Sequence, residues 1–209
     1  MEVEVKCRAD VRALRRKLAG KARYVQTVRQ KDYLLDYKDA KLKKKDQVFR
    51  VREEYVLHGP NWGEKRVFVT FKGKKRKAKL AKVREEVEEE VHANVEEVLA
   101  EAEGMGLRPR LQYEKIREYY QMKEASVEID FFPQYKELGP FVEIEGKDER
   151  HIANVMKQLG LKREDVEPKS YPQLVQEHAK KRVRLKRAGR KAKTPLKSHA
   201  NRAHGKRKK

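Results

Sequence analysis

The sequence predicts an α+β protein in which antiparallel strands dominate and a few helices lie between them. Three observations support this class. Seven of the eight stretches that read as strands alternate apolar with charged or polar residues, the period-two pattern of strands that bury one face. Four stretches carry apolar residues at helical spacing after a residue that commonly caps helices. Glycine, proline or charged turns separate most of these stretches.

The first half of the chain contains five of the expected strands and one helix. Asp10 is a typical N-cap, and Gly20 ends the helix that follows it. Lys38 to Asp46 reads as a charged turn, and the segment from Gly73 to Lys82 as a very basic connector. The strands are expected at about residues 2–8, 24–37, 47–57, 65–72 and 83–92.

The second half repeats this mixture of helices and strands. Asn94 and Asp148 are expected to cap helices that end near Gly104 or Gly106 and at Gly160, and Ser170 to cap a last helix that runs into a basic tail. The remaining three strands are expected at about residues 110–120, 125–131 and 140–146.

Charge divides the chain into two parts. The 209 residues carry a net charge of +21, and residues 178–209 hold 15 Lys or Arg and no acid, so residues 1–177 carry about +6 (21 − 15). We therefore expect a globular domain at 1–177 and a basic extension at 178–209 that is disordered or helical. Such a charge indicates a polyanionic partner, for example nucleic acid, nucleotide or polyphosphate.

Several classes of protein and site are disfavoured by what the sequence lacks. One cysteine, Cys7, excludes an intrachain disulfide framework and suits a reducing compartment. No apolar run approaches the length of a membrane span, so a soluble, cytoplasmic protein without a membrane partner is expected. The sequence has no P-loop, no zinc-type histidine spacing and no nucleophile elbow.

The charged faces of the strands are largely single-signed. Glu2, Glu4 and Lys6 share one face of the first strand while Val3 and Val5 share the other. Six further strands repeat this arrangement, with charged or polar faces at Arg50 and Arg52; Thr70 and Lys72; Arg84, Glu86 and Glu88; Lys115 and Arg117; Glu128 and Asp130; and Glu143 and Glu145. Two interpretations fit the alternation. The charged face is solvated on an open sheet, or it lines a closed sheet where carboxylates and cations meet around a metal–phosphate pair.

These motifs, in this order, resemble the CYTH family, whose members are also called triphosphate tunnel metalloenzymes. The opening EVEVK resembles the family's ExExK, and LGPFVEIE at residues 138–145 resembles its L-G-x-F-V-E-I-E. Further matches across residues 1–177 are QKDYLLD at 30–36, FRVR at 49–52, TFKG at 70–73, REEVE at 84–88, KIR at 115–117 and SY at 170–171. The similarity is greatest to class IV adenylyl cyclase-type and thiamine triphosphatase-related proteins.

The resemblance implies a fold and an activity. The fold would be an antiparallel eight-stranded β-barrel, the triphosphate tunnel, with flanking helices. The activity would be metal-dependent chemistry on a triphosphate inside the barrel. As a lyase the protein would convert ATP to cyclic AMP and pyrophosphate; as a hydrolase it would cleave ATP, tripolyphosphate or thiamine triphosphate. A homodimer is a family-level expectation.

The resemblance also implies roles for individual residues. Magnesium, or manganese in its place, prefers hard oxygen ligands. The expected metal ligands are Glu2, Glu4 and Glu145, with Glu143, Glu128 and Asp130 as further candidates. Phosphate contacts are expected from Lys6, Arg50, Arg52, Lys72, Arg84, Lys115 and Arg117. Catalytic roles are expected for Lys6, Glu86 and Glu88.

The tail leaves a second hypothesis open. In this interpretation the chain is a non-catalytic protein that binds RNA or another polyanion through residues 178–209 and the barrel. Basic runs contact nucleic-acid phosphates without sequence preference, but this one lacks the interleaved aromatic residues of a base-stacking surface.

Overall fold

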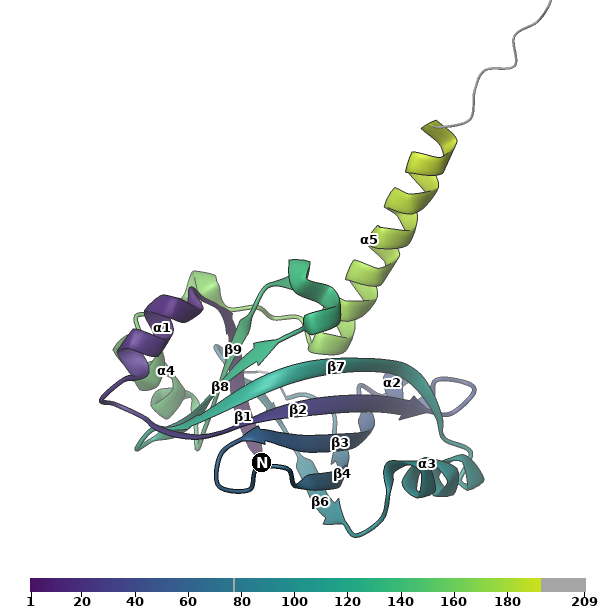
Figure 1. The fold of residues 1–209 in the computed structure, drawn as a ribbon, viewed down its shortest axis with the longest axis horizontal. Coiled ribbons are helices and arrows are strands. Elements are labelled where there is room, and N and C mark those ends of the chain that lie inside the picture. The colour runs from purple at the N-terminus through teal and green to yellow at the C-terminus, as the bar shows by residue number, and fades with distance from the viewer. Residues whose placement is uncertain (77, 193–209) are drawn as a thin grey trace, which may run out of the picture.

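A single antiparallel sheet dominates the computed structural model, which describes residues 1–76 and 78–192 (Figure 1). Within these residues the sheet has nine strands in the order β5-β1-β9-β8-β7-β2-β3-β4-β6. Their bounds are β1 Glu2–Arg8, β2 Arg23–Asp36, β3 Val48–His58, β4 Lys65–Lys72, β5 Lys82–Arg84, β6 Glu86–Val91, β7 Arg108–Gln121, β8 Ala125–Phe131 and β9 Phe141–Gly146.

The chain itself joins the two edges of this sheet. β5 pairs with β1, and β6 pairs with β4 at the other end of the strand order, although Glu85 alone separates β5 from β6. The sheet must therefore curl into a nearly closed barrel. This confirms the predicted antiparallel barrel, but the strand number is nine in the described residues rather than eight. The run expected as one strand at 83–92 breaks at Glu85, because its two halves hydrogen-bond to opposite edges.

Helices form where the capping residues predicted them. The Asp10 side chain accepts from the backbone at the start of α1 (Val11–Leu18), Asn94 forms a capping box with Glu97 of α3 (Val95–Gly104), and Asp148 caps α4 (Glu149–Gln158). The fourth predicted helix is α5 (Tyr171–Ala192). Shorter segments are α2 (Lys41–Lys44) and the 3₁₀ helices η1 (Pro133–Leu138) and η2 (Arg163–Asp165).

The single turn of α2 replaces part of the expected charged turn at 38–46. Asp36, at the end of β2, explains why it forms. Its carboxylate accepts backbone N–H groups of Leu42 at 2.9 Å and Lys43 at 3.0 Å. These bonds satisfy donors that a short helix leaves without partners.

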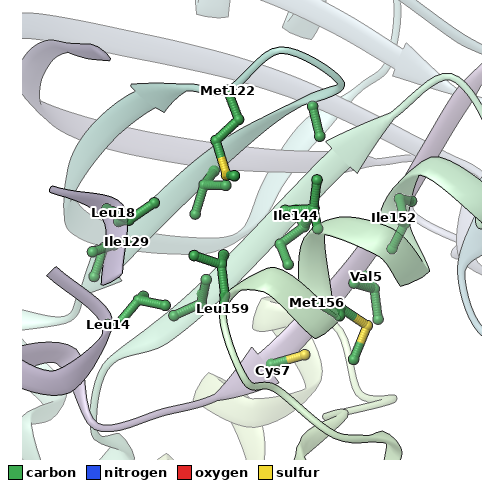
Figure 2. Close-up of a cluster of buried hydrophobic side chains, with 14 of the residues drawn as sticks. Val5, Cys7, Leu14, Leu18, Met122, Ile129, Ile144, Ile152, Met156 and Leu159 are labelled. Atoms are coloured by element: carbon green, nitrogen blue, oxygen red, sulfur yellow. The ribbon is translucent and has the colours of Figure 1, made fainter. Parts of the chain in front are cut away.

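The apolar faces of the strands pack under the helices. α1 and α4 cover β1, β8 and β9, where Val5, Ile129, Ile144 and Ile152 are almost completely buried (Figure 2). α3 covers a second cluster on β2, β3 and β4. Because these apolar faces lie on the outside of the barrel, the charged faces point into it. The structure thus favours the closed-sheet interpretation over a solvated open sheet.

Helix α5 extends away from the barrel (Figure 1). It continues to Ala192, across the boundary that charge suggested after residue 177, and residues 193–209 of the expected extension lie outside the described residues. Among the helices of residues 1–76 and 78–192, none has the length and apolar character needed to cross a membrane.

Candidate functional site

The interior of the barrel holds a cavity of about 650 Å³ that side chains from all nine described strands line. Alternation along each strand directs the charged residues inward, and strand pairing brings them together. The predicted site residues that line the cavity are Glu2, Glu4, Lys6, Arg50, Arg52, Lys72, Arg84, Glu86, Glu88, Lys115, Arg117, Glu128, Glu143 and Glu145. Asp130 does not line it and is buried behind the wall.

One guanidinium pairs with three of the predicted carboxylates. Arg117 on β7 donates from Nε and Nη2 to Asp130 at 2.7 and 2.6 Å, and from Nη2 to Glu143 at 2.5 Å; its Nη1 pairs with Glu128. Burial opposes ionisation of Glu143, but Arg117 together with the neighbouring lysines holds the pKa of Glu143 below its usual range. Burial raises the pKa of Glu128 to about 7 despite Arg117. These three carboxylates are therefore engaged with Arg117 in the structure.

A second buried ion pair joins β2 and β3. Arg52 donates from Nε and Nη2 to the two carboxylate oxygens of Asp32 at 2.6 and 3.1 Å. Burial works against this charge, yet Arg52 lowers the pKa of Asp32 below its usual range. The guanidinium of Arg52 is thereby fixed at the cavity wall.

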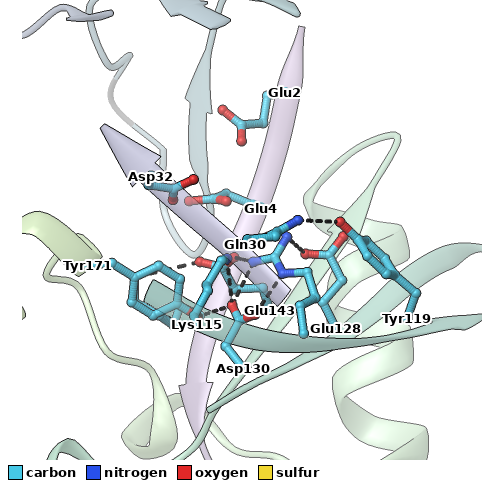
Figure 3. A network of polar contacts seen from close by, with 12 residues as sticks. Glu2, Glu4, Gln30, Asp32, Lys115, Tyr119, Glu128, Asp130, Glu143 and Tyr171 are labelled. Carbon is cyan, nitrogen blue, oxygen red and sulfur yellow. Dashed lines mark hydrogen bonds and ion pairs between the residues drawn. The ribbon is translucent and has the colours of Figure 1, made fainter. Parts of the chain in front are cut away.

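Two lysines lie deep in the cavity. Lys6 and Lys115 are 1% and 2% exposed, and burial lowers the pKa of each to about 8. Lys115 Nζ donates to Asp130 at 3.1 Å, whereas Lys6 Nζ lies 3.7 Å from Glu143. Figure 3 shows Lys115, Asp130 and Tyr171 close together. Both lysines still carry a proton at neutral pH, because a pKa near 8 lies above it.

Three other carboxylates form an acidic cluster on β1 and β9. Glu4 pairs across the strands with Glu145, and Glu2 lies two residues away on the same face. Burial raises the pKa of Glu4, and the Glu143 and Glu2 carboxylates raise it further. Burial also raises the pKa of Glu145, as do Glu2 and Glu4. Lys82 Nζ lies 3.5 Å from Glu4. Strand pairing thus places three carboxylates close together on β1 and β9.

Cationic side chains lie beside the acidic cluster on β5, where Arg84 is paired across the strands with Glu2, and on β3 and β4. Arg50 donates to Glu88 at 2.7 Å, and Lys72 donates to Glu2 at 2.6 Å and lies 2.9 Å from Glu86. Arg84 is 7% exposed, its nearest carboxylate is Glu2 at 3.8 Å, and its buried Nη1 has no hydrogen-bond partner in the described residues. A buried N–H group without an acceptor is costly, so an oxygen-rich anion would stabilise this position.

The chemistry of the acidic cluster suits a divalent cation, but the present positions of its side chains do not. Carboxylate oxygens are the hard ligands that such an ion prefers, and burial, together with the neighbouring carboxylates, raises the pKa values of Glu4 and Glu145. However, nowhere in residues 1–76 and 78–192 do three His, Cys, Asp or Glu side chains form a group that could hold a metal. Binding would require Glu2, Glu4 and Glu145 to turn toward one another.

The sequence patterns missed several residues that line the cavity. Lys82 lies on β5 two residues before Arg84, a same-face spacing that could have identified it; the basic connector around it hid the signal. Tyr113, Tyr119 and Tyr171 also line the cavity.

The comparisons with known proteins agree with this geometry. The model of the CYTH domain family matches residues 1–171. No curated protein matches the chain. The structure of PH1819 protein from Pyrococcus horikoshii is 25% identical, with a TM-score of 0.71, and the match covers 85% of this chain and 99% of that one.

Two more distant structures share the fold. A candidate adenylate cyclase from Vibrio parahaemolyticus is 20% identical, with a TM-score of 0.65, and the match covers 84% of this chain and 97% of that one. A candidate adenylyl cyclase from Hippeastrum, described as having a dominant triphosphatase activity, is 15% identical, with a TM-score of 0.54 and coverages of 77% and 89%.

Proposed function

The chain belongs to the CYTH domain family, and on this premise we propose that it is a metal-dependent enzyme that hydrolyses a triphosphate inside the barrel. The observation that supports this most is that one cavity holds both an unpartnered cationic donor and a cluster of carboxylates. Arg84 offers a buried N–H group without an acceptor, and the acidic cluster of Glu2, Glu4 and Glu145 faces the same space. A triphosphate with a divalent cation would satisfy both.

The cationic side chains bind the substrate in this proposal. Arg84, Arg50 and Lys72 contact phosphate oxygens from one wall, while Lys6 and Lys115 contact them from the interior. Arg52, fixed by Asp32, adds a preorganised charge. Fixed cations in a buried cavity stabilise the negative charge that develops on the leaving phosphate, and they do so without reorganising during the reaction.

Glu2, Glu4 and Glu145 would hold magnesium, or manganese in its place. When bound, the metal would neutralise phosphoryl oxygens and lower the pKa of a coordinated water. Glu88 has a different part: burial opposes its ionisation, but Arg50 and Thr70 lower its pKa, so it remains a carboxylate that orients Arg50. Glu86 does the same for Lys72. We therefore assign both residues to positioning of the cations.

We favour hydrolysis over cyclisation because, in the part of the chain that the structure describes, two aromatic side chains that could stack on a base already contact other groups. A cyclase must hold an adenine beside the triphosphate. Two of the tyrosines that line the cavity are already engaged: Tyr171 lies against the two lysines, and the Tyr119 hydroxyl accepts from Gln30 at 2.9 Å. An inorganic or a small organic triphosphate is thus the expected substrate.

The test is product analysis with tripolyphosphate and with ATP, in magnesium and in EDTA. Orthophosphate release that requires magnesium is the expected result. Cyclic AMP with pyrophosphate from ATP would assign the cyclase reaction instead. No turnover of either substrate, or of thiamine triphosphate, would contradict the proposal.

Basic surface near the cavity favours nucleic-acid binding as a second candidate function. Exposed lysines of α2 and of the 73–82 connector meet where Lys75 pairs with Asp46 at 3.3 Å, and both of these residues line the cavity. α5 begins at the same cavity, and the segment 178–209, with its 15 basic residues, starts within this helix.

RNA binding by the full chain at several salt concentrations tests this second function. The exposed residues Lys180, Lys181 and Arg182 would be replaced by glutamine. Weaker binding and a smaller salt dependence in the variant are expected. Equal binding by the variant and the wild-type protein would exclude this surface.

A further inference from the structure

Tyr171 lies at the start of α5 and contacts the two buried lysines of the cavity. It is the first residue of the helix, is 6% exposed, and lines the cavity. Its ring packs against Phe132 and Phe141, with centroids 4.9 and 5.5 Å apart. The ring is thus part of a buried aromatic cluster at the start of α5.

The ring contacts two buried ammonium groups. Lys6 Nζ lies 3.9 Å from the ring centroid and Lys115 Nζ lies 4.9 Å from it. Both distances fall within the range in which the negative face of an aromatic ring attracts a cation. One tyrosine side chain thus lies beside a cation from β1 and a cation from β7.

The hydroxyl of Tyr171 makes a separate contact. It donates to Asp130 Oδ2 at 2.6 Å, the same oxygen that accepts from Lys115 at 3.1 Å and from Arg117 at 2.6 Å. Asp130 is completely buried. The hydroxyl therefore fixes the carboxylate that determines where Lys115 lies.

A ring has an advantage over a carboxylate as the neighbour of these lysines. An ammonium has three N–H donors, and every carboxylate in hydrogen-bond range engages one of them. Among the described residues, the nearest carboxylate oxygen to Lys6 Nζ is 3.7 Å away, beyond hydrogen-bond length, and Lys115 has one such bond. The ring stabilises the charge and leaves the remaining donors for another oxygen-rich group.

We propose that Tyr171 is a positioning residue of the triphosphate site: its ring holds the ammonium groups of Lys6 and Lys115, and its hydroxyl orients Asp130. This role, which rests on the proposed triphosphate binding, is to keep N–H donors of both lysines directed at phosphate oxygens. The anchoring of α5 at the cavity follows from the same side chain.

The test separates the ring from the packing. Tyr171→Phe keeps the ring and removes the hydroxyl. Pentafluorophenylalanine at position 171 keeps the shape of that ring but removes the negative potential of its face. The matched control is Phe132→Leu, which alters the same cluster, whereas the ring that Lys6 and Lys115 contact is that of Tyr171. Binding of inorganic tripolyphosphate in EDTA is measured by calorimetry for each protein.

Pentafluorophenylalanine is expected to weaken tripolyphosphate binding by about tenfold relative to Tyr171→Phe. Phe132→Leu is expected to bind as the wild-type protein does. Equal affinities for the fluorinated and the Tyr171→Phe proteins would overturn the role of the ring, and a similar loss in Phe132→Leu would show that packing explains the effect.

NMR of the lysine ε-methylene groups reports the ring contact without any ligand. Ring-current shifts at Lys6 and Lys115 are expected in the wild-type and Tyr171→Phe proteins; unshifted signals would overturn the contact. Absence of tripolyphosphate binding in a wild-type protein with shifted signals would overturn the proposed function, and with it this role of Tyr171.

Discussion

Removing the Arg117 side chain should lower the free energy of unfolding of the barrel, an effect separate from the loss of any substrate contact. This side chain is 7% exposed and is the shared partner of Asp130, Glu143 and Glu128. Arg117→Met keeps much of the side-chain volume and removes the charge. Three carboxylates then lie in a buried cluster without the cation that offsets their burial.

The size of the effect follows from what remains. Four charge-assisted contacts disappear, but Lys115 stays 3.1 Å from Asp130 and Lys6 stays 3.7 Å from Glu143. The free energy of unfolding should therefore fall by about 3–5 kcal/mol at neutral pH, the range for breaking a buried ion pair. For a domain of this size the Tm should fall by about 10 °C.

The difference in Tm between the two proteins should also change with pH in a defined direction. Although burial opposes it, Arg117 holds the pKa values of Asp130 and Glu143 below their usual ranges, so these groups stabilise the wild-type protein above those ranges. Without Arg117, burial raises both pKa values, and the variant loses stability as the pH rises. The difference in Tm should thus be larger at pH 8 than at pH 5.

Thermal melts of the two proteins at both pH values measure this difference. The control is Arg15→Met, which breaks an exposed pair with Glu118 and should change stability by less than about 1 kcal/mol. A difference in Tm for Arg117→Met that matches the control, or that is the same at pH 5 and pH 8, would refute the reasoning.

Three other substitutions have distinct expected outcomes. Glu4→Gln should lower magnesium-dependent turnover by about 100-fold or more, because it removes a metal ligand, with little change in Tm; the exposed Glu89→Gln is the control, and full activity of Glu4→Gln would exclude the metal assignment. Arg84→Gln should weaken tripolyphosphate binding by about tenfold in calorimetry, since it removes an unpaired phosphate donor; unchanged affinity would contradict that role. Burial raises the pKa of Glu128 to about 7, above its unfolded value, so its ionisation removes stability as the pH rises through about 7. Glu128→Gln, which stays neutral, should therefore lose less Tm between pH 5 and pH 8 than the wild-type protein, and parallel losses would disprove the pKa shift.

Alternation along the strands predicted much of the fold and of the site. It identified the residues that share the charged faces, from Glu2 and Glu4 on β1 to Glu143 and Glu145 on β9, and all of these except Thr70 and Asp130 line the cavity. Alternation could not show which face points inward, because both faces repeat with the same period. The family resemblance suggested the answer, and the helices packed on the apolar faces provide it.

Strand register is the information that the sequence lacks. Glu128, Asp130 and Glu143 remained further candidates for metal ligands beside Glu2, Glu4 and Glu145, because all six are carboxylates on strand faces. The pairing of β7 with β8, which sets Arg117 opposite Asp130, distinguishes the first group from the second. The break at Glu85 was missed for the same reason, since it depends on which edges β5 and β6 join.

The most direct test of the account is a crystal structure of the wild-type protein with tripolyphosphate and manganese, whose anomalous signal locates the metal. The account predicts phosphate oxygens against Arg84, Arg50 and Lys72, and a manganese peak bound by carboxylates of the acidic cluster. A triphosphate bound on the outer basic surface, with the barrel cavity free of both, would contradict it.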